Sequence, residues 1–577
     1  MSEKKTKKQR KPMPKALVVV LAVIISAAAL IKWGFIFLFF FPLYFGIEQY
    51  LFLEADLPAN KVETSLTVEQ RLSDFDYMYE MVCLENPRME MFEEAYGISY
   101  DDIYNTYREY IVNAETDFEY FAYMADFLAV LPGEHNYMSL PEYEFDDIMG
   151  FDMCNVYGTQ EIKDYITSWH EDFRDDVESY SDCSLIVFRY IDGKYVGAVP
   201  TKDTLKYVSD YDMGQIISID GKDPRDMCFD FLERTVPVYD SGNDCFFRNY
   251  LLFNDCRGVK HTAEILMPDG TTVTADLYKD PAFEVAYFDG LSAYPAQGED
   301  QPADTGDEDT ETPVVDVWSD DYVPETYSIY ADETRKLVYL NSISCETYEG
   351  ERLVRDFNEA VEQADADTVI LDLRNNGGGE IDFCTTQLLP ALFSHDQQFA
   401  SPVIGGVNPY TSKMYDSIFQ RMVLFYYDSE TPQVDSDYYY YSDHFDVTGN
   451  AIRDFKIYVL TSQQTFSSGD IITNLCKEYD NAVIVGTNTE GEGLCGSPLN
   501  CYLPESRFAF VYVPSVNVDH PENSYYGTEP DVYVHYTLDD YNAKQELNRQ
   551  GMNTSEYETR LLWDHTLLTV LDMIDAD

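Results

Sequence analysis

The chain has 577 residues, of which 45% are hydrophobic and 25% are charged, and its 104 acidic against 39 basic side chains give a formal net charge of −65. This length exceeds what one compact core accommodates, so we expect several domains. Because so negative a surface repels phosphate groups, the composition excludes binding to nucleic acid and to anionic membrane surfaces.

The N-terminal end carries a basic segment followed by a long apolar one. Residues 1–15 are rich in lysine and arginine, and residues 16–47 are almost entirely apolar or aromatic. About 20 apolar residues span a bilayer, and basic residues before them indicate a cytoplasmic N-terminus. We therefore expect a basic cytoplasmic tail at 1–15 and a single-pass transmembrane anchor in the lipid bilayer at 16–47, with the rest of the chain extracellular. A cleaved signal peptide is the alternative, since small residues occur at 26–29.

Apolar residues at helical spacing predict an N-terminal helical domain over 63–140. The pattern is clearest in 116–131 and repeats in 67–82 and 101–112. It ends at LPGEHNYMSL (131–140), where proline and glycine interrupt it.

Alternating apolar and polar residues with Asp-Gly turns predict a β-rich module over 183–280. The stretch GQIISIDGK (214–222) resembles a strand of PDZ domains, which implies binding of an extended peptide by strand addition. A generic β-hairpin is the alternative. Residues 293–321 are rich in Pro, Asp, Glu and Thr, and this composition predicts an acidic linker or loop.

From residue 326 to residue 577 strands and helices alternate. We expect strands at 336–343, 367–374, 456–462 and 481–487, and helices at 348–364 and 561–574. This alternation, with fully apolar strands, predicts a layered α/β domain around a buried and at least partly parallel sheet.

Two adjacent serines stand where a predicted strand gives way to a helix, in TFSSGD (465–470). The free N–H groups of the first helical turn could face whatever Ser467 or Ser468 attacks. A serine nucleophile also needs a base within hydrogen-bond reach. The alternative is that one of the serines caps the helix.

A glycine triplet follows a buried strand in LDLRNNGGG (371–379). Glycines let backbone N–H groups approach a ligand closely. The N–H of Gly378 or Gly377, together with that of Ser468, could therefore hold an oxyanion. The alternative is an ordinary glycine-rich turn.

These two motifs occur with two others, and the set resembles the signatures of the tail-specific (C-terminal processing) serine peptidases. The four stretches match in order and spacing: LDLRNNGGG (371–379), TFSSGD (465–470), NAVIVGTNTEGEG (481–493) and GTEPDVYV (527–534). The resemblance covers most of residues 67–540. It implies a ClpP/crotonase-like fold, with Ser467 as the nucleophile and Asp470 in place of the family's usual glutamate.

The resemblance also bears on the general base. One branch of the family uses a lysine where this chain has Glu492, and we interpret Lys477 as a surface residue. The other branch, which includes the tricorn core and the interphotoreceptor retinoid-binding repeats, carries a histidine at the end of the helical domain. That place is held here by His135, which is preceded by Glu134 rather than the family's Gly or Ser. The resemblance thus implies His135 as the base, and an ordinary loop histidine is the alternative.

The histidine-using branch has a late acidic residue that orients the catalytic network, and the resemblance implies Glu522 for this role. Glu529 and Asp531 are alternatives, and His520 is a reserve candidate for the base.

The 11 cysteines form no pattern with zinc spacing, so we expect neither a structural metal nor a cofactor. Cys495 and Cys501 are close enough in the sequence to bridge a hairpin.

The expected function is that of a membrane-anchored, extracytoplasmic serine endopeptidase that acts on a protein or peptide substrate. A catalytically inactive peptide- or ligand-binding protein on the same fold is the alternative. An acyl-CoA enzyme of the crotonase type fits poorly, because no basic cluster is available for the CoA phosphates. The sequence does not indicate an oligomeric state.

Overall fold

The computed structural model describes residues 66–83, 86–115, 117–129, 131, 135–139, 187–198, 214–227, 237–248, 261–277, 326–407, 433–434, 438–496, 498–506 and 508–576. The predicted tail at 1–15, anchor at 16–47 and linker at 293–321 lie outside these ranges. Within the described ranges, no helix has both the length and the apolar character needed to cross a membrane.

The N-terminal part is helical, as predicted. Its helices are α3 (Val68–Val82), α4 (Pro87–Tyr96), α5 (Tyr100–Asn113) and α6 (Asp117–Ala129). A capping box of Thr67 and Gln70 starts α3. The sequence analysis missed α4, although Asn86 caps it, Pro87 occupies its first turn and Gly97 ends it at φ 65°.

Residues 187–277 contain a five-stranded antiparallel sheet in the order β2-β3-β4-β7-β8. Its strands are β2 (Val187–Ile191), β3 (Lys194–Ala198), β4 (Gly214–Ile219), β7 (His261–Leu266) and β8 (Thr272–Leu277). A 3-10 turn η2 (Pro224–Met227) and a hairpin of β5 (Pro237–Asp240) and β6 (Cys245–Arg248) lie between β4 and β7 in the chain. Asp192 and Gly193 turn β2 into β3 at φ 51° and 73°, as the Asp-Gly pattern predicts. The PDZ-like assignment of this sheet stays a prediction.

The largest sheet has six strands in the order β20-β16-β15-β11-β10-β9. They are β9 (Tyr327–Asp332), β10 (Leu337–Ser342), β11 (Thr368–Asp372), β15 (Lys456–Thr461), β16 (Ala482–Gly486) and β20 (Val532–Tyr533). All neighbouring pairs are parallel except β9 with β10. The predicted α/β domain with a largely parallel sheet is thus confirmed.

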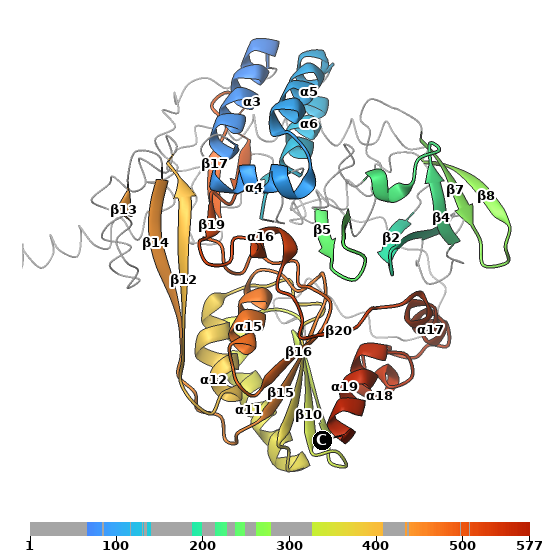
Figure 1. Cartoon of the computed structure of the whole chain (residues 1–577), viewed down its shortest axis with the longest axis vertical. Coiled ribbons are helices and arrows are strands. Elements are labelled where there is room, and N and C mark those ends of the chain that lie inside the picture. The colour runs from blue at the N-terminus through green and yellow to red at the C-terminus, as the bar shows by residue number, and fades with distance from the viewer. Residues whose placement is uncertain are drawn as a thin grey trace, which may run out of the picture. The chain divides into compact units, whose positions relative to one another are not determined.

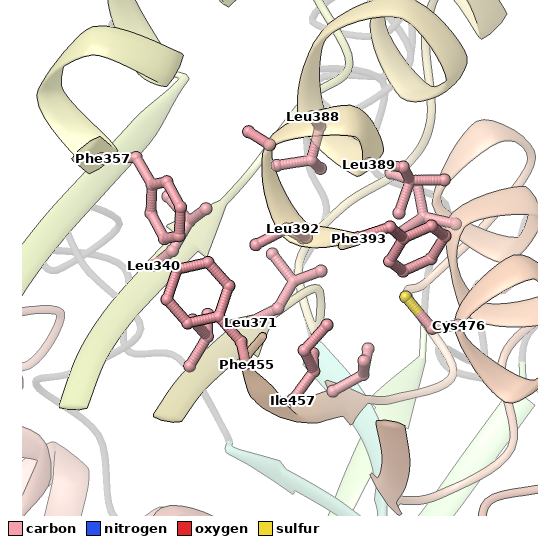
Figure 2. Close-up of a cluster of buried hydrophobic side chains, with 14 of the residues drawn as sticks. Leu340, Phe357, Leu371, Leu388, Leu389, Leu392, Phe393, Phe455, Ile457 and Cys476 are labelled. Carbon is pink, nitrogen blue, oxygen red and sulfur yellow. The ribbon is translucent and has the colours of Figure 1, made fainter. Parts of the chain in front are cut away.

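Helices cover both faces of this sheet (Figure 1). On one face lie α11 (Thr347–Ala364), η3 (Phe383–Leu388), α12 (Leu389–Leu392) and α15 (Ser468–Lys477), and on the other α18 (Tyr557–Arg560) and α19 (His565–Ala576). Strand alternation supplies both cores, since Leu340 and Leu371 pack on the first face while Tyr339 and Ile370 pack on the second. Figure 2 shows the first core, where Phe357 of α11 lies beside Leu340 of β10, and Leu389 of α12 lies beside Phe393.

Two smaller sheets extend this domain. One is β13 (Gln433–Val434), β14 (Tyr438–Val447), β12 (Gln397–Gly406) and β19 (Ser515–Asn517), paired in that order. The other is β1 (Tyr137–Ser139), β18 (Ala509–Tyr512) and β17 (Leu499–Tyr502). Short helices α16 (Asn523–Tyr526) and α17 (Leu538–Arg549) complete the C-terminal part. Cys495 and Cys501 are both free, so they do not form the considered hairpin bridge.

Candidate active site

Ser467 occupies the sharp turn between β15 and α15. Its backbone has φ 52° and ψ −120°, a conformation that a residue with a side chain adopts rarely and only when its surroundings hold it there. Two bonds hold it: the Phe466 N–H donates to the Asn376 carbonyl (3.0 Å), and the Ser467 N–H donates to the Gly491 carbonyl (3.1 Å). Although Ser467 stands at the N-cap of α15, its hydroxyl makes no capping hydrogen bond. The capping alternative therefore does not account for this serine.

His135 lies against Ser467. Its Nε2 is 3.1 Å from the Ser467 Oγ, although the two residues are 332 apart in the sequence. Strand β1 begins two residues later and pairs with β18, with Tyr137 opposite Val511. The side chain of Phe466 packs on the imidazole, with ring centroids 4.5 Å apart. These contacts fix the imidazole beside the hydroxyl.

The carboxylate that faces the other side of His135 belongs to Glu492. Its Oε2 is 3.5 Å from His135 Nδ1, an ion-pair distance longer than a hydrogen bond. The carboxylate is fully buried, and its Oε1 pairs with the guanidinium of Arg88. Burial raises the pKa of Glu492, but the positive charge of Arg88 and the contact with His135 outweigh burial and hold the pKa below its ordinary value. Glu492 is therefore an anion at neutral pH.

Arg88 reaches this carboxylate from the first turn of α4. Its side chain is 1% exposed, and it also donates to the carbonyl of Val513 (3.3 Å) and packs on the ring of Phe92. The helix that the sequence analysis missed thus supplies the cation that holds Glu492.

The structure puts Glu492, and not Glu522, against His135. Glu522 is half exposed and lies 3.5 Å from the Nδ1 of His520, which is half exposed as well. Asp531 accepts a hydrogen bond from the backbone N–H of Ile484 (2.8 Å) and lies 4.0 Å from the Nζ of Lys477. These acids and the reserve base are therefore not assembled with Ser467 in the described residues.

The glycine loop packs directly on the nucleophile. Gly378 has φ 104°, and a Cβ added to it would stand 2.7 Å from the Cβ of Ser467 and 3.0 Å from the Ser468 nitrogen. Only glycine fits there. The Ser468 N–H opens α15, where first-turn donors lack helical partners. The Gly378 N–H, however, donates to the side-chain oxygen of Asn376 (2.9 Å), so this half of the predicted oxyanion site is engaged within the protein.

One family model matches the part of the chain that holds most of this arrangement. Residues 337–534, which hold the serine, the glycine loop and Glu492, match the model of peptidase family S41. The chain carries an S41 peptidase domain. The protein is a serine-type peptidase, and its resemblance to the tail-specific peptidases is confirmed.

The solved structures that match this chain are distant from it in sequence. Mature CPAF complexed with lactacystin is 16% identical with a TM-score of 0.46, and the match covers 88% of this chain and 99% of that one. The photosystem II D1 C-terminal processing protease is 13% identical with a TM-score of 0.33, over 81% and 93% of the two chains. A putative S41 protease from Bacteroides fragilis NCTC 9343 is 14% identical with a TM-score of 0.29, over 69% and 85%. The search of curated proteins gave no match.

A second buried acid of the S41 domain ties the helix of the nucleophile to neighbouring loops. Asp470 accepts hydrogen bonds from the hydroxyls of Thr489 and Thr528 (both 2.6 Å), from the Gly493 N–H (3.1 Å) and from the amide of Asn523 (3.0 Å). Burial raises the pKa of Asp470 above its ordinary value, and these hydrogen bonds oppose that rise. No hydrogen bond within the described ranges joins the Asp470 carboxylate to Ser467 or His135, and its hydrogen bonds instead hold the neighbouring loops against α15.

Sequence reasoning missed the role of Glu492. It placed Glu492 where one branch of the family has its lysine base, but it did not ask what would compensate a negative charge in the loop GEGLCG (491–496). The partner, Arg88, is 404 residues away, so no local pattern reveals it. One signal was available in the sequence. Glu492 stands among small and apolar residues, which indicates a buried position, and a buried acid needs a partner.

Proposed function

We propose that the protein is a serine endopeptidase in which Ser467 is acylated, His135 is the general base and Glu492 orients and stabilises the base. The observation that carries the proposal is the 3.1 Å contact between His135 Nε2 and Ser467 Oγ. A nucleophile and a base within hydrogen-bond reach, with the base held by a third group, are the parts of a catalytic triad.

The steps follow from the positions of these atoms. His135 Nε2 takes the proton of the Ser467 hydroxyl as the oxygen attacks the peptide carbonyl. The imidazolium that forms is stabilised by the buried anion Glu492, which Arg88 holds in place. His135 then returns the proton to the leaving amine, and water activated by the same imidazole releases the acyl group.

The oxyanion is stabilised by backbone donors next to the nucleophile. The Ser468 N–H at the start of α15 supplies one donor. The Gly378 N–H supplies the second when a substrate oxygen competes with the Asn376 side chain for it. Loss of one such donor typically costs about 3 kcal/mol of transition-state stabilisation.

The wider organisation is part of the same proposal. The use of histidine supports the branch of the family that includes the tricorn core, on a ClpP/crotonase-like fold. The sheet of residues 187–277 acts as a PDZ-like module that presents a peptide by strand addition. The apolar residues 16–47 anchor the chain in the cell membrane, with the N-terminus cytoplasmic and the peptidase domain extracellular.

The proposal is tested by labelling the purified full chain with a fluorophosphonate probe, which reacts with activated serines. We expect labelling of the wild type and its loss in Ser467→Ala and in His135→Ala, with circular dichroism showing that both variants stay folded. Labelling that survives in His135→Ala would overturn the role of the base.

A second hypothesis is that the protein binds peptides without cleaving them. One observation favours it: the Gly378 N–H donates its hydrogen bond to the Asn376 side chain and so is not free for an oxyanion. A folded wild type that is not labelled at all, yet binds peptides, would support this reading against the peptidase mechanism.

A further inference from the structure

A third side chain meets His135 and Glu492 at the site. Cys495 is half-buried, and its Sγ lies 3.5 Å from the same Glu492 Oε2 that faces His135. One ring nitrogen of His135, a carboxylate oxygen of Glu492 and the Cys495 sulfur all lie within 4.8 Å of one another. The Nδ1 atom is buried and has no hydrogen-bond partner among the described residues. Three potential ligand atoms thus converge on one point.

Two of the three separations between these atoms match a tetrahedral metal site. Zinc bonds of about 2.0–2.1 Å to nitrogen and oxygen and about 2.3 Å to sulfur place ligand atoms roughly 3.3–3.6 Å apart. Both distances from Glu492 Oε2, to His135 Nδ1 and to Cys495 Sγ, are 3.5 Å. Arg88 binds the other carboxylate oxygen, so Oε2 stays available.

The chemistry of the donors selects the cation. Imidazole, thiolate and carboxylate together suit zinc, whereas magnesium and calcium prefer oxygen ligands alone. One carboxylate and one thiolate also balance the charge of a divalent cation. Three protein ligands leave a fourth position for water.

We propose that His135 Nδ1, Glu492 Oε2 and Cys495 Sγ form a zinc site that reversibly switches off the peptidase. This inference rests on the proposed role of His135 as the base. Binding releases the thiol proton of Cys495, so affinity for zinc rises with pH.

Inhibition follows from the two nitrogens of the imidazole. In the active form Nδ1 carries the proton and faces Glu492, so Nε2 has a free lone pair for the Ser467 proton. A zinc ion takes the lone pair of Nδ1, so the single proton of the neutral ring moves from Nδ1 to Nε2. His135 can no longer accept a proton from Ser467. Zinc also takes Oε2 of Glu492 away from its contact with the ring.

The binding test uses the purified, chelator-treated full chain titrated with Zn²⁺ alone, with Mg²⁺ as the control cation. We expect one Zn²⁺ per chain and binding weakened at least about tenfold in Cys495→Ala. Co²⁺ in place of Zn²⁺ should give thiolate-to-metal absorption that disappears in Cys495→Ala. The matched control is Cys501→Ala, which removes a buried free thiol six residues later in the chain, outside the cluster, and should keep the absorption. Binding that is unaffected by Cys495→Ala, or no binding, overturns the proposal.

The switch is read out separately by the rate of fluorophosphonate labelling with and without one equivalent of Zn²⁺. We expect Zn²⁺ to slow labelling of the wild type and of Cys501→Ala at least about tenfold, and to slow Cys495→Ala much less relative to its own metal-free rate. Labelling that zinc does not slow refutes the switch and leaves the peptidase mechanism standing. Absence of labelling without metal refutes the mechanism and the switch, while one-site zinc binding that depends on Cys495 still establishes the metal site.

Discussion

The change Glu492→Gln separates the chemical role of this side chain from its structural one. Glutamine keeps the shape of the side chain and removes the charge that faces both Arg88 and His135. The Arg88 and Glu492 side chains are 1% and 0% exposed, so the substitution leaves a buried guanidinium without its counter-charge. Breaking such a pair by removing one partner costs about 3–5 kcal/mol of unfolding free energy. Folded domains have only about 5–15 kcal/mol, so the variant should be folded but clearly less stable.

The loss of activity should be larger than the loss of stability explains. Replacing the acid of a triad by its amide lowers turnover about 10⁴-fold, which corresponds to roughly 5.4 kcal/mol of transition-state stabilisation. We would measure stability by urea denaturation and activity by the rate of fluorophosphonate labelling, at a temperature where circular dichroism shows the variant to be folded.

Glu522→Gln is the matched control, because it removes the acid that the sequence analysis selected. Glu522 is half exposed beside His520, so its replacement should change the unfolding free energy by less than about 0.5 kcal/mol. Labelling should stay within about twofold of the wild type. A folded Glu492→Gln variant that labels at the wild-type rate, or a Glu522→Gln variant that does not label, would refute the assignment.

Three more predictions concern neighbouring groups. Gly378→Ala places a Cβ 2.7 Å from the Cβ of Ser467 at a residue with φ 104°, so the rate of labelling should fall at least about tenfold. In the control Gly377→Ala the added Cβ meets nothing within 4 Å, so this variant should label at the wild-type rate. Equal labelling rates for the two variants would contradict this prediction. Asp470→Asn turns an NH₂ group toward hydrogen-bond donors and should cost about 3 kcal/mol in urea denaturation, and an unchanged midpoint would count against the network. The folded pKa of Glu492 is lowered, so its stabilisation is present above the ordinary glutamate range and is lost as pH falls through the folded pKa. The stability gap between wild type and Glu492→Gln should therefore narrow in acid, and a gap that is constant down to about pH 3 would contradict the lowered pKa.

The sequence analysis correctly predicted the elements whose residue pattern is contained within a single segment of the chain. The sequence analysis found the apolar strands β10, β11 and β15 and the amphipathic helix α11. The pattern of apolar residues that identifies each of them lies entirely within its own segment. Ser467 and Gly378 were found because a strand–turn–helix junction and a glycine triplet are local too, and the structure brings them together.

The features that were missed depend on distant partners. The spacing of residues in the sequence does not indicate which acid lies next to His135. Glu492 can be buried as a carboxylate only because Arg88 of α4 compensates its charge, and Arg88 is distant in the sequence. The Gly378 N–H donates to the Asn376 side chain because of how the glycine loop bends, and the sequence Asn-Asn-Gly-Gly-Gly does not determine that bend. Family resemblance supplied His135, since nothing near it in the sequence marks it as functional.

The three-residue strand β1 bears on which parts of the chain the active site requires. It pairs with β18, and His135, two residues before it, lies beside Ser467 from the other half of the chain. The domain that matches the family model contains the serine and Glu492, but it holds neither His135 nor Arg88. On the proposed mechanism, a separated C-terminal half would keep its nucleophile and lose its base. The proposed activity therefore requires that the helical segment and the peptidase domain stay together.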